Sequence, residues 1–274
     1  MSLSATQERP GLQVSANRSF LEETILVAGK EIRESIFGVR GSMWAVISAL
    51  VLSLMSYLLL TDAELSLLDQ SEMLYIVSSL SVGLGMLVTG ILAGDSIAGE
   101  RERSTLEGVL LTPIRLGSLV AGKVGAVLAG WLLIFAVSAP YILVVGSGST
   151  VALPALAYTF ALGTLCVGAF AALVVGMSSV ARSGRGVTLG ALAVFLGMAA
   201  PTLLGTVLQK SWFGNIYNFV SPFAQVRLSL DSVIVDKEPF LLQLPHLTAL
   251  FGFAALTIAF LVFAARRISF ERGD

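Results

Sequence analysis

Residues 119–145 read LVAGKVGAVLAGWLLIFAVSAPYILVV, and Lys123 is the only charged side chain among them. About 20 helical residues of this apolar character are enough to cross the ~30 Å hydrocarbon layer of a membrane. Lys123 lies near one end of the stretch, where its long side chain can reach the lipid headgroups. The stretch therefore predicts a membrane-spanning helix.

Five further stretches share this character and contain no Asp, Glu, Lys or Arg. They are residues 42–60, 73–94, 151–179, 187–207 and 246–265. The whole chain is 55% hydrophobic and only 13% charged, whereas soluble domains carry about 25% charged residues. We therefore predict an all-α polytopic membrane protein whose transmembrane domain, residues 42–265, contains six helices.

The basic residues predict the orientation of these spans. With the N-terminus in the cytoplasm, 14 of the 17 Lys and Arg residues lie on the cytoplasmic side. The first outer loop, TDAELSLLDQSE, then carries four acidic residues and no basic one. We expect both termini to be cytoplasmic, with tails at residues 1–18 and 266–274.

Composition excludes several classes of site. The single Cys166 excludes an internal disulfide and a cysteine metal cluster, and His246 is the only histidine. No metal site and no catalytic residue is predicted. The first twenty residues are polar, so they do not form a cleaved signal peptide with an apolar core. The net charge of −1 gives no reason to expect nucleic acid as a partner.

Two segments outside the spans are predicted to be helical. Residues 19–41 contain an amphipathic interfacial helix over 19–39, opened by a capping box of Ser19 and Glu22. It is either an anchor or a lever that also contacts a cytoplasmic partner. The outer segment 208–245 is rich in aromatic residues. Its Ser-Pro pair predicts a short helix near residues 222–230, on the outer surface or re-entrant, with a plain closing loop as the alternative.

Charges gather in GERERSTLEGVLLTP, residues 99–113, where Glu100, Arg101, Glu102 and Arg103 are consecutive. Placing four charges at bilayer depth costs on the order of 10 kcal/mol, so this run lies outside the lipid. We assign it to a cytoplasmic loop, residues 95–117.

A short helix is predicted to follow these charges, over residues 105–111. Ser104 and Glu107 have the spacing of a second capping box, and the Thr-Pro pair that follows stops the helix. The apolar side chains at helical spacing are Leu106, Val109 and Leu110. About seven residues cannot form a stable helix alone, so we expect docking onto another protein. The alternative is a solvated turn of mixed charge.

The stretch AGDSIAGERERSTLEGVLLTPIRLGSLVAGK, residues 93–123, resembles the loop between the second and third spans of permease subunits of ABC type-2 transporters. Those loops read I..E+e.GTLE.LL.TP, followed by GK. The matching positions are Ile97, Glu100, Arg101, Glu102, Thr105, Leu106, Glu107, Leu110, Thr112, Pro113, Gly122 and Lys123. Ser104 departs from the family, which often has Gly at that position.

The resemblance implies an exporter permease, in the inner membrane of a prokaryote, that pairs with a second permease copy and with cytoplasmic ATP-binding subunits. The loop helix is then the coupling helix held by the ATPase, and ATP and Mg²⁺ bind the partner. This chain has no G-x-x-x-x-G-K-[ST] motif and is expected to carry no cofactor and no enzymatic activity. The implied coupling residues are Glu100, Arg101, Glu102, Arg103, Ser104, Thr105, Leu106, Glu107, Val109 and Leu110.

The substrate path is less well defined by the sequence. Ser78, Ser81, Gly85 and Thr89 share one face of the second span. They form either a path lining or a surface for close helix packing. Apart from Lys123 near one end of the third span, the spans contain no charge, which argues against ion coupling and favours an uncharged, amphiphilic, lipid-like or hydrophobic substrate.

Three other functional classes are alternatives to this interpretation. A membrane protease lacks support, because VGSGST at residues 145–150 does not match G-x-S-G and no base is near its hydroxyls. A secondary transporter is disfavoured, because no internal repeat is evident. A permease-like subunit that anchors or regulates a partner without transport stays open.

Overall fold

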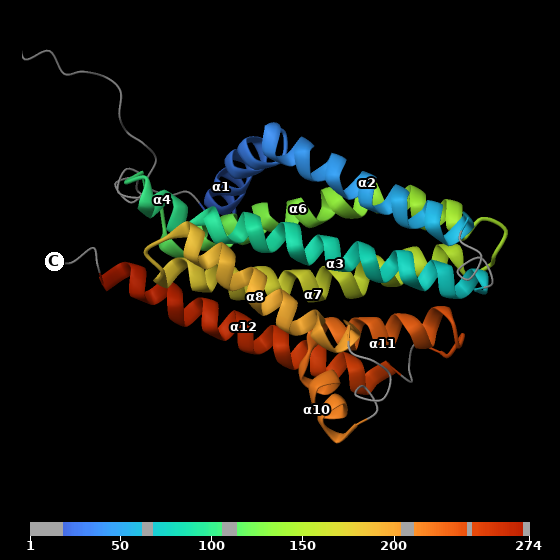
Figure 1. The fold of residues 1–274 in the computed structure, drawn as a ribbon. Coiled ribbons are helices and arrows are strands. Elements are labelled where there is room, and N and C mark those ends of the chain that lie inside the picture. The colour runs from blue at the N-terminus through green and yellow to red at the C-terminus, as the bar shows by residue number, and fades with distance from the viewer. Residues whose placement is uncertain (1–18, 62–67, 106–113, 204–210, 240–242, 271–274) are drawn as a thin grey trace, which may run out of the picture.

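The computed structural model describes residues 19–61, 68–105, 114–203, 211–239 and 243–270. Within these ranges the chain forms ten helices and no strand (Figure 1). The prediction of an all-α chain is confirmed for this part of the protein.

Five helices are long and apolar enough to cross a membrane. They are α2 (Val39–Thr61), α3 (Gln70–Ser96), α6 (Leu116–Val145), α7 (Ala152–Val180) and α12 (Leu244–Phe270). Each matches a predicted span to within five residues at either end. The protein is therefore a multi-pass membrane protein.

The helix α8 (Gly184–Leu203) corresponds to the stretch predicted at residues 187–207. Its described apolar part, Gly184–Ala200, is shorter than the five long helices. The sixth span therefore stays a prediction.

The core of the bundle lies along α3 and α7, which have the largest buried shares of the five long helices. Trp131 of α6 is fully buried there, and its indole Nε1 donates a hydrogen bond to Thr164 Oγ1 at 2.9 Å. A Cβ at Gly85 or Gly163 would collide with this indole ring. These two glycines therefore let α3 and α7 approach the tryptophan of α6.

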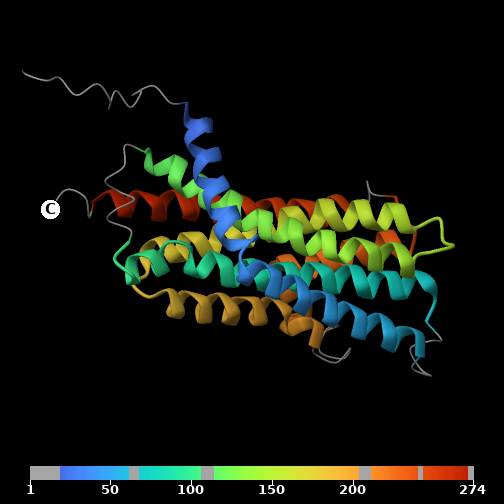
Figure 2. The same cartoon turned by 90° about the horizontal axis from the view of Figure 1, so that it is seen from above.

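The helix α1 (Phe20–Ser35) lies across α6 near one end of the bundle (Figure 2). The predicted capping box is present, since the backbone N–H of Ser19 donates to Glu22 Oε2 at 3.2 Å. A Cβ at Gly122 would lie 2.7 Å from Val27, so the two helices are in close contact. α1 thus packs on a transmembrane helix and does not only lie on the membrane surface.

The prediction that this helix runs to residue 39 is wrong. It ends at Ser35, and α2 begins at Val39, directly after a tight corner at residues 36–38. A Cβ at Gly38 would lie 2.5 Å from the carbonyl oxygen of Glu34, and one at Gly41 would collide with the backbone of Ile36. The apolar periodicity continues through the corner, which is why the sequence pattern missed it.

The predicted outer helix near residues 222–230 is present as α11 (Pro222–Ile234). Ser221 is its N-cap, with Oγ accepting a hydrogen bond from the backbone N–H of Ala224 at 3.3 Å, and Pro222 follows it. α11 contacts α3, α7, α8 and α12, so it is a packed element and not a plain closing loop. A second helix, α10 (Trp212–Val220), was not predicted.

Figure 1 shows which elements share an end of the bundle. α1, the short helix α4 (Ala98–Glu102), the α7–α8 turn and the C-terminal end of α12 lie at one end. The α6–α7 connection lies at the opposite end. The charged run is therefore grouped with the amphipathic helix and the C-terminus.

Candidate functional site

The charged run begins inside a helix that almost continues α3. A single bend at Ile97 separates α3 from α4. The Ser178 hydroxyl of α7 accepts hydrogen bonds from the N–H groups of Ile97 (3.2 Å) and Ala98 (2.8 Å). It also donates to the carbonyl of Gly94 at 3.1 Å. One hydroxyl thus uses its full hydrogen-bonding capacity to fix the bend.

The helix α4 ends in a Schellman motif. The N–H of Ser104 donates to the carbonyl of Arg101 at 3.1 Å, and the N–H of Thr105 donates to the carbonyl of Glu100 at 2.9 Å. Ser104 has φ of +57°, the left-handed conformation of the residue just past such a helix end. An N-cap residue is extended, so the prediction that Ser104 caps a following helix is wrong. Glycine adopts the left-handed conformation without a steric penalty, which explains why the family often has Gly at this position.

Ser104→Gly is expected to stabilise the protein by about 0.5–1 kcal/mol, because a left-handed conformation is unfavourable for residues with a Cβ. Equilibrium unfolding in mixed micelles of a mild detergent and SDS measures this change. Ser147→Gly is the matched control, since Ser147 is exposed and has negative φ. Equal changes in both variants would contradict the role given to Ser104.

A buried cation joins α4 to three other helices. Lys123 Nζ donates to Glu100 Oε1 at 2.8 Å, to Glu31 Oε1 at 2.9 Å and to the carbonyl of Ser96 at 2.7 Å. The Lys123 side chain is only 1% exposed. It does not reach toward lipid headgroups, as the sequence suggested, but connects α1, α3, α4 and α6. Its three ammonium donors are all used.

The next two charges bind the ends of neighbouring helices. Arg101 donates to the carbonyls of Ala181 at 2.8 Å and Ser179 at 3.3 Å, at the C-terminal end of α7. Glu102 Oε2 accepts from the N–H of Gly184 at 3.0 Å, at the start of α8. A cation at a helix C-terminus and an anion at an N-terminus both complement the helix dipole. The pair therefore fixes α4 to the α7–α8 turn.

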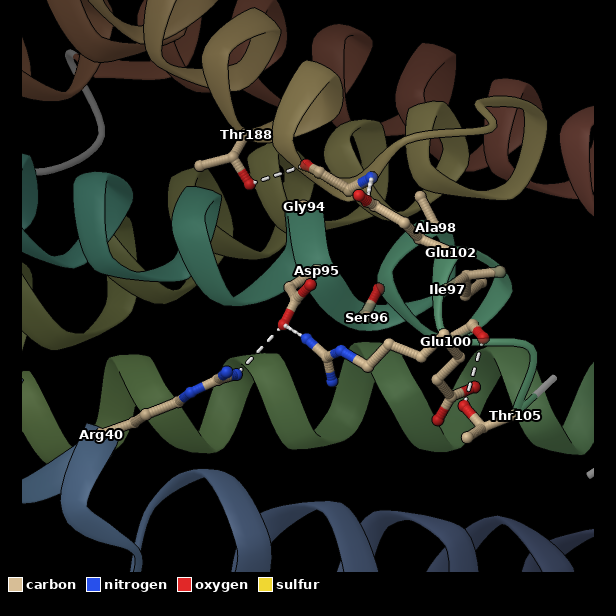
Figure 3. Close-up of polar contacts among 12 residues, drawn as sticks. Arg40, Gly94, Asp95, Ser96, Ile97, Ala98, Glu100, Glu102, Thr105 and Thr188 are labelled. Carbon is tan, nitrogen blue, oxygen red and sulfur yellow. Dashed lines mark hydrogen bonds and ion pairs between the residues drawn. The ribbon is translucent and has the colours of Figure 1, made fainter.

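The fourth charge shares an acidic partner with α2. Arg103 donates to Asp95 Oδ2 at 2.7 Å, and Arg40 donates to the same oxygen at 3.0 Å. Figure 3 shows Arg40 and a second guanidinium approaching Asp95 from opposite sides. Asp95 lies in the last turn of α3, so this contact joins α2, α3 and the end of α4.

The charged residues are therefore not simply exposed to solvent. They hold α4 against other parts of this chain. Glu100, Arg101, Glu102 and Arg103 each contact another element of this chain, and Thr105 Oγ1 donates to the carbonyl of Glu100 at 3.1 Å. The remaining predicted coupling residues lie outside the described part of the chain. They are Leu106, Glu107, Val109 and Leu110. The coupling helix at residues 105–111 stays a prediction.

The four candidate path residues of α3 are buried inside the chain. Ser81 and Thr89 donate to backbone carbonyls four residues earlier in their own helix, both at 2.7 Å. Gly85 faces Trp131, and Ser78 is fully buried. This placement favours the helix-packing alternative, and a path lining at these positions stays a prediction.

Sequence reasoning missed the partners of the charged run. A lysine inside an apolar span signals that an acidic partner exists, but not that it is Glu31, 92 residues away. Ser178 carries no sequence signal at all. In the described ranges, no group of three or more His, Cys, Asp or Glu side chains could hold a metal ion.

Comparison with protein families identifies a match over most of the chain. A protein-family model described as "ABC-2 family transporter protein" matches residues 25–274. The match begins within α1 and takes in every later helix described above. No curated protein matches the chain significantly.

Proposed function

The chain belongs to the ABC-2 transporter family, and on that premise we propose that it is the permease of an ATP-driven exporter of amphiphilic, lipid-like substrates. Its partners are a second permease copy and a cytoplasmic ATP-binding subunit, which binds ATP and Mg²⁺. The observation that carries the proposal is the anchoring of the charged run to the helix bundle.

In this proposal, residues 104–111 receive the movement of the ATPase and α4 passes it on. Contacts of α4 and its neighbours through Lys123, Arg101, Glu102 and Asp95 reach α1, α2, α6, α7 and α8. Because these contacts are short and partly buried, the end of α4 cannot shift without moving the helix ends that it holds. The charges are therefore internal transmission elements, and the partner binds the segment beyond them.

The arrangement of the ends supports the proposed cytoplasmic location of both termini. α1, α4 and the C-terminal end of α12 share one end of the bundle (Figure 1). This end also carries Arg182 and Arg185 in and after the α7–α8 turn. An excess of basic residues is typical of the cytoplasmic side.

An exposed apolar face on α2 is available for the proposed pairing with a second permease. α2 has the smallest buried share of the five long helices. Val46, Leu50, Leu54 and Tyr57 on this helix are each more than half exposed. In the proposed assembly this face contacts lipid or the second permease.

Copurification tests the proposal. The tagged full-length chain, extracted from its native membrane in a mild detergent, is expected to bring down an ATP-binding subunit at one copy per permease. Quantitative mass spectrometry measures this ratio, and addition of ATP to the complex should give hydrolysis. A chain that is recovered folded but without any ATP-binding protein would contradict the proposal.

A further inference from the structure

A cavity of about 730 Å³ lies beside the charged run, with walls from α1, α2, α3, α4, α6 and α8. This volume is typical of sites for small organic ligands. Its apolar wall includes Met43 and Trp44 from α2, Leu92 from α3 and Leu189 from α8. Eight charged side chains line another part of it. The cavity therefore crosses the boundary between the apolar spans and the charged end of the bundle.

One side of this cavity carries an excess of positive charge. Arg40 and Arg103 both line it and share the single carboxylate of Asp95. Arg185 also lines the cavity and has no hydrogen bond or ion pair among the residues that the structure describes. Three guanidinium groups thus face one carboxylate, and this arrangement favours a phosphate.

The other side carries an excess of negative charge. Glu31 and Glu100 line the cavity and share the single ammonium of Lys123. Glu34 lines it as well, and its ion pair with Lys30 is long, at 3.9 Å. Glu100 Oε2 is buried and has no hydrogen-bond partner within the described ranges. This second oxygen can accept a hydrogen bond from a cationic donor.

We propose that the cavity binds the headgroup of a zwitterionic aminophospholipid, with the phosphate at Arg40, Arg103 and Arg185 and the primary ammonium at Glu34 and Glu100. The two sides meet at the C-terminal end of α4, where Glu100 and the C-cap residue Arg103 are three residues apart. On a helix this spacing separates side chains by about 5–6 Å. The two-carbon ethanolamine linker separates an ammonium from a phosphate on the same scale. An acyl chain then lies along Trp44 and Leu189.

The chemistry distinguishes this headgroup from other abundant ones. A choline headgroup has the same charges but no N–H to donate to Glu100 Oε2 or to Glu34. A glycerol headgroup offers the phosphate without any cation for the acidic side. The proposal goes beyond the transport function, since it concerns binding by this chain alone and requires neither ATP nor a partner.

Native mass spectrometry of the full-length chain tests the proposal. The purified, delipidated protein is titrated with phosphatidylethanolamine, phosphatidylcholine and phosphatidylglycerol of identical acyl chains. We expect the first molecule of phosphatidylethanolamine to bind about tenfold more tightly than the first molecule of either other lipid. This ratio corresponds to the contribution of one charge-assisted hydrogen bond. Equal binding of the three lipids, or tighter binding of the glycerol lipid, would overturn the proposal.

Single substitutions test which side of the cavity binds the phosphate and which side binds the ammonium. Arg185→Gln should weaken all three lipids about five- to tenfold, because each carries the phosphate. Glu34→Gln should weaken only the ethanolamine lipid, to the level of the glycerol lipid. Arg182→Gln is the matched control, since it removes an exposed cation three residues from Arg185 that does not line the cavity.

The variants also distinguish specific binding in the cavity from general electrostatic attraction of lipids to a basic surface. Equal losses in Arg185→Gln and Arg182→Gln would indicate such attraction and overturn the proposal. The comparison of lipids on the unaltered chain remains decisive if a variant does not fold. A chain that binds the ethanolamine lipid but copurifies no ATPase would refute the transport function and leave this inference standing.

Discussion

Lys123→Met is expected to lower the free energy of unfolding by about 3–5 kcal/mol, the range for removing one partner of a buried ion pair. The Lys123 side chain is 1% exposed, and its two acidic partners, Glu31 and Glu100, are each 19% exposed. Methionine keeps an unbranched side chain, one atom shorter, but leaves two carboxylates facing each other without a cation. Equilibrium unfolding in mixed micelles measures the change.

Two further variants test the cause of this loss. Lys30→Met removes an exposed lysine whose ion pair with Glu34 is 3.9 Å long, and we expect a change below about 0.5 kcal/mol. Combining Lys123→Met with Glu31→Gln and Glu100→Gln removes the unpaired charges and should recover part of the stability. A loss in Lys123→Met no larger than that in Lys30→Met would contradict the buried network.

The transmembrane helices could be predicted because their signal is physical and local. A run of apolar residues long enough to span the lipid has few alternatives, so the bounds of α2, α3, α6, α7 and α12 agree closely with the sequence. The corner after α1 was missed for the opposite reason. It depends on two glycines that permit close backbone approach, while the apolar periodicity continues unchanged.

The sequence predicts where the charged run lies in the chain, but it does not predict which residues its charges contact. Charge density alone predicts that residues 100–103 lie outside the lipid, but the partners of these charges lie up to 82 residues away in the chain. Ser104 shows a second limit. A serine followed three residues later by glutamate fits a capping box, yet here it closes the preceding helix in a left-handed conformation. When one helix ends where the next is expected to begin, residue type alone does not show whether a serine closes the first helix or caps the second.

The anchoring of α4 changes which variant tests coupling most cleanly. Substitution of Glu100 and Glu107 together would probe the coupling loop, but Glu100 also binds the buried Lys123. Its loss therefore alters stability as well as coupling. Leu106 follows the anchored residues and belongs to the predicted apolar docking face, so it separates the two effects.

Leu106→Asp is expected to weaken binding of the ATP-binding subunit about 30-fold or more, since a buried hot-spot residue contributes about 2 kcal/mol or more to an interface. ATP-driven transport should fall with it, because a charge on the docking face must be desolvated in the ATPase cleft. Copurification stoichiometry and transport into inverted membrane vesicles measure the two effects. The unfolding free energy of the variant, measured without the partner, is the control that separates loss of docking from loss of folding.

Leu106→Met is the matched control, because it preserves an apolar side chain of similar volume and should leave binding and transport near their original levels. Normal transport by Leu106→Asp would show that force reaches the bundle through another surface. Loss of transport with full retention of the ATPase would place residue 106 in transmission and not in docking. The anchored charges of α4 would then be the first elements that the bound ATPase moves.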